Sequence, residues 1–120
     1  MIRTWDETCN VFEKLINKDK KFLYMYNLVI ALRDSKYANY IYGWTSVNDL
    51  YIVQNEVEYP YDGPRLLISP LENDKFEFRF IDTDKYEKQW KRIYSASEGF
   101  KELEKFFFNI HWFYPNFIKE

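Results

Sequence analysis

The side chains best suited to molecular recognition are concentrated in residues 49–62, which read DLYIVQNEVEYPYD. Tyrosine buries a large contact area at a small entropic cost, and carboxylates attract and orient basic groups. Pro60 and Pro64 stiffen this segment in an extended form and lower the cost of ordering it. The segment therefore predicts a surface that binds a basic protein. The residues expected to contact that partner are Glu56, Glu58, Tyr59, Tyr61 and Asp62.

The charge of the chain is unevenly distributed. Residues 49–87 hold ten acidic and four basic residues, a net charge of −6, whereas the segments before and after them are each at +2. The whole chain carries −2, which argues against a protein dedicated to phosphate backbones, because such binding needs a basic surface. A negative middle can steer a basic partner, although an ordinary solvated acidic face would give the same pattern.

Side chains that commonly carry catalysis or bind metals are scarce. His111 is the only histidine and is expected late in an aromatic-rich helix, and Cys9 falls on the apolar stripe of an N-terminal helix. A Cys9–His111 dyad would have no third group to orient it. One cysteine and one histidine cannot make the usual structural zinc site, and the acidic residues miss the spacing of a calcium loop. The sequence therefore predicts no catalytic residue, cofactor or metal, and a protein that is not an enzyme.

A second candidate surface combines basic and aromatic residues near the C-terminal third of the chain. Lys88, Lys91 and Arg92 lie close in sequence to Trp90 and Tyr94, a mixture found in proteins that bind single-stranded nucleic acid. The alternative functions are therefore a small nucleic-acid-binding regulatory protein and an accessory interaction domain.

Helical patterns occur at both ends of the chain. Thr4 and Glu7 have the spacing of a capping box, and the apolar residues after them predict an amphipathic helix over residues 4–18. Residues 22–39 suit a buried helix or a buried strand, and we favour a helix that Asp19 caps and that aligns Leu23, Tyr26 and Ile30 on one face. Ser97 is expected to cap a last helix, which Pro115 stops. Its apolar stripe is expected at Phe100, Leu103, Phe107 and Ile110.

The middle of the chain has the pattern of β-strands. YIYGW, LYIVQ, RLLIS, KFEFRFID and WKRIYSA are separated by turn-forming segments such as LENDK. Phe76, Phe78 and Phe80 alternate with polar residues, as in a half-buried antiparallel strand, and Tyr51 is expected in the core with its strand. The predicted fold is α+β: an antiparallel meander of about four or five strands packed against an N-terminal helix or helices and a C-terminal helix.

Length and composition fit one compact domain over residues 1–120. The unpaired cysteine fits a reducing compartment, and the charged N-terminus does not read as a signal peptide. The longest apolar stretch, residues 22–32, is too short to span a bilayer. We therefore expect a cytoplasmic protein without a membrane-spanning segment.

The chain as a whole resembles the small cytosolic immunity proteins of bacterial polymorphic and contact-dependent growth-inhibition toxin systems. The resemblance lies in the acidic α+β composition, the region WTSVNDLYIVQ and the closing segment SEGFKELEKFFF. It implies an inhibitor that binds a toxin domain, often a basic nuclease, and blocks its active site or its substrate surface. The sequence thus predicts an immunity or antitoxin-like protein whose acidic, tyrosine-rich surface neutralises a basic toxin domain.

Overall fold

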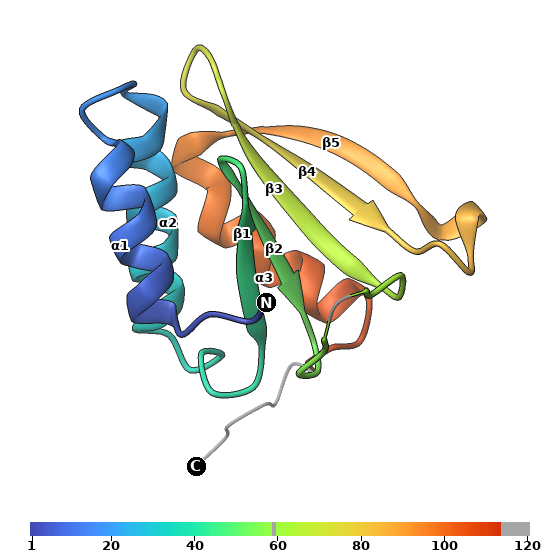
Figure 1. Ribbon diagram of the computed structural model, residues 1–120. Coiled ribbons are helices and arrows are strands. Elements are labelled where there is room, and N and C mark those ends of the chain that lie inside the picture. Colours follow the sequence, from blue (N-terminus) through green and yellow to red (C-terminus); the bar gives the residue numbers. More distant parts are fainter. Residues whose placement is uncertain (59, 114–120) are drawn as a thin grey trace.

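The computed structural model describes residues 1–58 and 60–113 (Figure 1). The predicted α+β class and the meander are confirmed, with five strands between two N-terminal helices and one C-terminal helix. The elements are α1 (Trp5–Leu15), α2 (Lys21–Arg33), β1 (Tyr42–Ser46), β2 (Asp49–Val53), β3 (Arg65–Leu71), β4 (Lys75–Ile81), β5 (Trp90–Ser95) and α3 (Gly99–Asn109), with 3-10 turns at Tyr86–Lys88 and Ala96–Glu98.

The five strands form one antiparallel sheet in the order β1-β2-β3-β4-β5. α2 contacts β3 and α3, α1 packs on α2, and α3 runs behind the sheet in the view of Figure 1. Because the strands are joined in a meander, the β2–β3 and β4–β5 connections lie at one end of the sheet. The β1–β2 and β3–β4 turns lie at the other end.

The core lies between the sheet and the helices. The predicted alternation in β4 is confirmed, because Phe76, Phe78 and Phe80 are all buried against the helices. The expectation for Tyr51 is wrong. It points to the opposite face of the sheet, where its ring stacks on Trp44 with centroids 5.0 Å apart. The period of two in a strand places Tyr51 on the side away from its buried neighbours.

The first two helices form as the sequence predicts, with different boundaries. In α1 the capping box is complete: the Thr4 hydroxyl accepts from the Glu7 N–H, and the Glu7 carboxylate accepts from the Thr4 N–H. Residues 21–33 are helical and not a strand. The N-cap residue is Lys20 and not Asp19 as predicted, although the Asp19 carboxylate accepts from the Lys21 N–H at 3.0 Å. α1 ends at Leu15 and α2 at Arg33, both before the predicted ends.

The face of α2 that is buried differs from the predicted one. Leu23 is 40% exposed, and Tyr26 and Ile30 are half-buried. This helix is apolar on most sides, so periodicity does not decide which side it buries; packing against α1, the sheet and α3 does. The buried residues are Phe22, Met25, Leu28, Val29 and Leu32.

The last helix starts later than predicted. Ser97 does not cap it, because residues 96–98 form a 3-10 turn and α3 begins at Gly99. A β-carbon at Gly99 would lie 2.5 Å from Cε2 of Phe76, so glycine permits this close approach of helix and sheet. Leu103 and Phe107 of the predicted stripe are fully buried. Phe100 and Ile110 are half-buried, and Phe106 takes their place in the core.

The two turns at one end of the sheet are built from different residues. The β3–β4 turn, which LENDK predicts correctly, places Asn73 and Asp74 at positive φ, a conformation that both residues tolerate. The β1–β2 hairpin turns through Val47 and Asn48, and Val47 has a φ of 56°. A β-branched side chain at this φ is strained, and Val47 is also 90% exposed.

α3 ends at Asn109. The predicted end of this helix, Pro115, lies outside the described residues. In the part of the chain that the structure describes, no helix is long and apolar enough to cross a membrane.

Candidate functional site

The predicted acidic surface lies at the end of the sheet where β2 connects to β3 and β4 connects to β5 (Figure 1). We call the connections 54–64 and 82–89 together the acidic end. A hydrogen bond joins the two connections, because the backbone carbonyl of Asp62 accepts from the Thr83 N–H at 3.2 Å. Two segments that are about twenty residues apart in sequence therefore form one surface.

Half of the ten acidic residues in the middle segment are internally compensated or turned inward. At the opposite end of the sheet, Glu72 pairs with Lys21 at 3.5 Å and Asp74 with Lys20 at 3.6 Å. On the outer face of the sheet, Glu77 lies 3.3 Å from Arg79 and 3.9 Å from Lys91. These contacts partly offset the charge of three carboxylates, of which Glu72 and Asp74 stay exposed.

Asp82 and Asp49 are also set apart from solvent. Asp82 is buried, and its carboxylate accepts from the Asp84 N–H at 3.2 Å, which fixes the start of the β4–β5 connection. Asp49 is half-buried on β2, and burial raises the pKa of its carboxyl group. These two carboxylates are therefore not exposed to a binding partner.

The five remaining carboxylates all lie at the acidic end. Each of them is exposed, and none has an ion-pair partner among the described residues. Four cations share these connections or adjoin them: Lys85, Lys88, Arg3, which lines a groove with Glu56, and Arg65, whose guanidinium donates to the Gly63 carbonyl at 2.9 Å. The acidic end therefore keeps an excess of negative charge. The carboxylates are Glu56, Glu58, Asp62, Asp84 and Glu87.

The predicted contact residues are spread across the width of the sheet end. Glu56 lies on the β1 side, where it lines a groove together with Arg3 and Tyr42. Asp62 lies on the β4 side, next to Thr83. Glu58 is exposed between them in sequence, and Tyr59 lies outside the described residues. The structure thus places three of the five predicted residues as exposed carboxylates on one connection.

Tyr61 has a mainly internal role. Its hydroxyl donates to the Pro64 carbonyl at 3.1 Å, and its ring covers Gly63, where a β-carbon would lie 2.5 Å from the hydroxyl oxygen. Burial raises the pKa of this hydroxyl group. Tyr61 therefore stiffens the β2–β3 connection and leaves only part of its ring for a partner.

The basic and aromatic residues of the alternative nucleic-acid surface are only partly brought onto one face, which holds Trp90, Arg92 and Tyr94. Alternation along β5 directs Trp90 and Arg92 toward the helix side, where the guanidinium lies 4.9 Å from the indole ring. Lys91 points to the opposite face and contacts Glu77. Lys88 lies in the preceding 3-10 turn. This division weakens the case for a continuous track along a nucleic-acid backbone.

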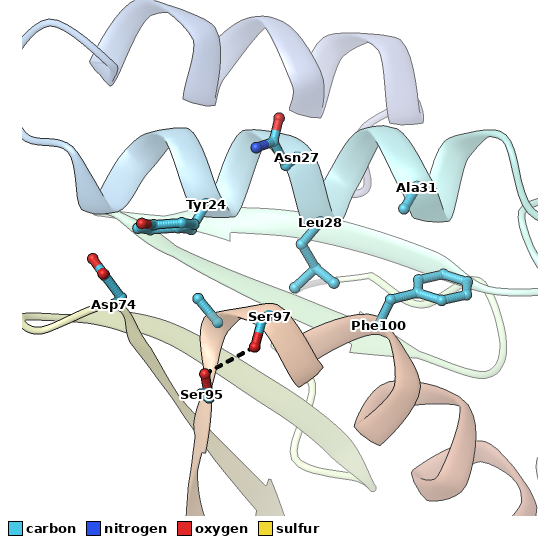
Figure 2. Close-up of a pocket in the computed structure, with 9 residues that line it drawn as sticks. Tyr24, Asn27, Leu28, Ala31, Asp74, Ser95, Ser97 and Phe100 are labelled. Carbon is cyan, nitrogen blue, oxygen red and sulfur yellow. Dashed lines mark hydrogen bonds between the residues drawn. The ribbon is translucent and has the colours of Figure 1, made fainter.

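A groove that the sequence did not reveal lies between α2 and the start of α3. Figure 2 shows the rings of Tyr24 and Phe100 on its two sides, Leu28 between them, and a hydrogen bond of 3.1 Å between Ser95 and Ser97. Its volume is about 450 Å³. The α2 side of this groove is lined by residues with the spacing of one helical face: Tyr24, Asn27 and Ala31. With residues 22–39 taken as a helix, this spacing would have indicated that they share a face.

A second groove, of about 430 Å³, lies between β5 and α3. Trp90, Arg92 and Tyr94 line it from the strand, and Phe106 lines it from the helix. At its rim, Lys105 pairs with Glu102 at 3.4 Å. The groove is amphipathic, because aromatic walls lie next to a guanidinium group that has no ion-pair partner in the described part of the chain.

Cys9 and His111 occupy different environments. Cys9 lies on α1 with its side chain buried in the hydrophobic core, and this burial raises the pKa of its thiol. His111 is exposed and follows the end of α3 at a φ of 61°, so it does not lie within a helix as expected. Among residues 1–58 and 60–113, no three histidine, cysteine or acidic side chains are grouped so that they could hold a metal ion.

No family model, curated protein or solved structure matches the chain. The resemblance to toxin-system immunity proteins therefore stays a prediction.

Proposed function

We propose that this protein is an immunity or antitoxin-like inhibitor that binds a basic toxin domain through the acidic end. One observation carries the proposal: the five exposed carboxylates at this end lack ion-pair partners in the described chain, whereas Glu72 and Asp74 at the opposite end each pair with a lysine. Carboxylates pair with lysines at one end of the sheet and have no such partners at the acidic end. The acidic end is therefore the better site for a basic partner.

The geometry also supports fast and selective association. The β2–β3 connection is tied to the β4–β5 connection through Asp62 and is stiffened by Tyr61, so little ordering is needed on binding. A concentrated negative surface steers a basic partner and raises the association rate, an effect that salt screens. A nuclease that holds phosphate backbones presents such a basic surface, and the acidic end would compete with nucleic acid for it.

The nucleic-acid alternative has less support, because Lys91 and Arg92 lie on opposite faces of β5. Retention of the protein on single-stranded DNA or RNA at low salt would favour that alternative over the inhibitor.

The first experiment is co-expression of this protein with the product of the neighbouring reading frame, followed by purification of the complex. We expect the neighbour to be toxic alone, harmless in co-expression, and stably bound. A neighbour without toxicity, together with no recovered protein partner, contradicts the proposal.

The second experiment maps the surface with matched charge reversals. The variant Glu56→Lys/Glu58→Lys changes the acidic end, and the control Glu13→Lys/Glu98→Lys changes the net charge equally at exposed sites elsewhere. At low salt we expect the first variant to associate about tenfold more slowly and the control to remain near the wild-type rate. Equal slowing of both variants would mean that net charge matters and that the acidic end is not the interface.

A further inference from the structure

The two edges of the sheet are protected differently. At the β1 edge, the N-terminal segment forms a bridge in which the Arg3 N–H donates to the Gly43 carbonyl at 2.9 Å. At the other edge, β5 pairs with β4 along its whole length, from Trp90 to Ser95. Within the described chain, no backbone hydrogen bond is made to the outward side of β5. An edge of this kind can pair with another extended segment.

The groove between β5 and α3 runs beside this open edge. Alternate residues of the strand, Trp90, Arg92 and Tyr94, line the groove, and Phe106 and Ile110 line it from the helix. The indole of Trp90 meets the ring of Phe106 edge-on, with centroids 5.9 Å apart. An added strand would therefore gain main-chain hydrogen bonds from the edge and an amphipathic groove for its alternate side chains.

We propose that β5 is a docking site for an extended segment of a partner protein, which adds a sixth strand to the sheet and places alternate side chains in the groove beside α3. This proposal does not depend on the acidic end, because the two surfaces differ in location and in charge.

The charge of β5 selects the occupant. The strand carries Lys91 and Arg92 and no acidic residue, and Arg92 has no ion-pair partner among the described residues. The one carboxylate that lines the groove in the described chain, Glu102, pairs with Lys105 on its own helix. A second copy of this chain would bring a second pair of cations to the same junction, which is unfavourable. A segment that alternates acidic and apolar side chains instead pairs its carboxylates with Arg92, because Lys91 points to the other face and contacts Glu77. The occupant is therefore an acidic, apolar strand of another protein.

A defined peptide tests this site on the intact chain. The probe is a fluorescein-labelled octapeptide of alternating Glu and Val, compared with a matched peptide of alternating Lys and Val. We expect the acidic peptide to bind at least tenfold more tightly, to shift amide signals of β5 and of the α3 residues that line the groove, and to slow amide hydrogen exchange in β5.

Variants then separate the site from general electrostatics. Arg92→Glu should weaken binding of the acidic peptide about tenfold, whereas Lys101→Glu, the same charge change at an exposed site on α3, should leave it within twofold. Asn109→Trp should also weaken binding by filling the groove, and circular dichroism establishes that each variant is folded.

Several results would overturn the proposal: no saturable binding of the acidic peptide at millimolar concentration, equal binding of the two peptides, or signal shifts that map to β1. A concentration-dependent dimer that protects β5 would identify a second copy as the occupant and would also overturn it. Failure here would leave the acidic end untouched, because the charge reversals of Glu56 and Glu58 test that surface separately.

Discussion

Substitution of Val47 by glycine should stabilise the protein, although it removes an apolar side chain. Val47 occupies the turn between β1 and β2 with a φ of 56°, where its branched β-carbon is crowded by its own backbone. The side chain is 90% exposed, so its removal sacrifices almost no packing. Glycine reaches this conformation without a steric penalty, and two-residue hairpin turns favour it for that reason.

The expected gain follows from two opposing terms. A left-handed conformation costs an L-residue about 1–2 kcal/mol, and this cost disappears in Val47→Gly. The more flexible unfolded chain of the glycine variant costs about 0.4–1 kcal/mol in return. The net result is a gain of roughly 1 kcal/mol in the free energy of unfolding, equivalent to about 4 °C in Tm for a domain of this size.

Urea denaturation followed by tryptophan fluorescence, together with calorimetry, measures this gain directly. Val47→Ala removes the branching but keeps the β-carbon, so it should recover only part of the gain. Val47→Pro cannot reach a positive φ and should lower stability. The strain is refuted if Val47→Gly is less stable than the wild type, or if Val47→Ala is as stable as Val47→Gly.

Two further substitutions test the core. Tyr37→Phe removes the hydroxyl that donates to Glu104 at 2.8 Å from a residue that is 1% exposed, and it should cost about 2 kcal/mol of unfolding free energy in urea. Burial, and after it the Glu104 carboxylate, raises the pKa of Tyr37, so the folded protein keeps this proton while the unfolded chain loses it near pH 10. The stability of the wild type should therefore fall as the pH rises above 10. If the stability of Tyr37→Phe fell with the same slope, Tyr37 would not be the cause. Gly99→Ala should lower stability by about 1 kcal/mol, because the clash with Phe76 outweighs the better helix propensity of alanine, and an unchanged or higher denaturation midpoint would show that the helix shifts freely.

The parts of the fold that were predicted correctly depend on short-range patterns. The capping box of Thr4 and Glu7 joins groups three residues apart, and the alternation of Phe76, Phe78 and Phe80 follows from the geometry of a single strand. The parts that were missed depend on neighbours from elsewhere in the chain. The start of α3 at Gly99 reflects its contact with Phe76, and the buried side of α2 is set by packing against α1, the sheet and α3. Tyr51 is an exception, because the period of two along β2 would have placed it opposite Leu50 and Ile52.

The candidate site shows the same division. The position of Glu56, Glu58 and Asp62 in a polar connection could be read from the sequence, because prolines and strand patterns surround them. The inward turn of Tyr61 could not, since its hydrogen bond to Pro64 depends on how the connection folds over Gly63. The open edge of β5 could not be predicted either, because the sequence does not show which strands lie at the edges of the sheet.

By itself, the sequence determined the α+β class, the order of the elements and the concentration of acidic residues in the middle of the chain, because each of these is written in local periodicity and composition. The tertiary structure alone decided which carboxylates are available to a partner. Lys21 pairs with Glu72 across a separation of 51 residues, and no comparable pair forms for the exposed carboxylates of the acidic end within the described chain. The physical reason is that Coulomb attraction acts over a few ångströms in space, and only the fold determines which charges come that close.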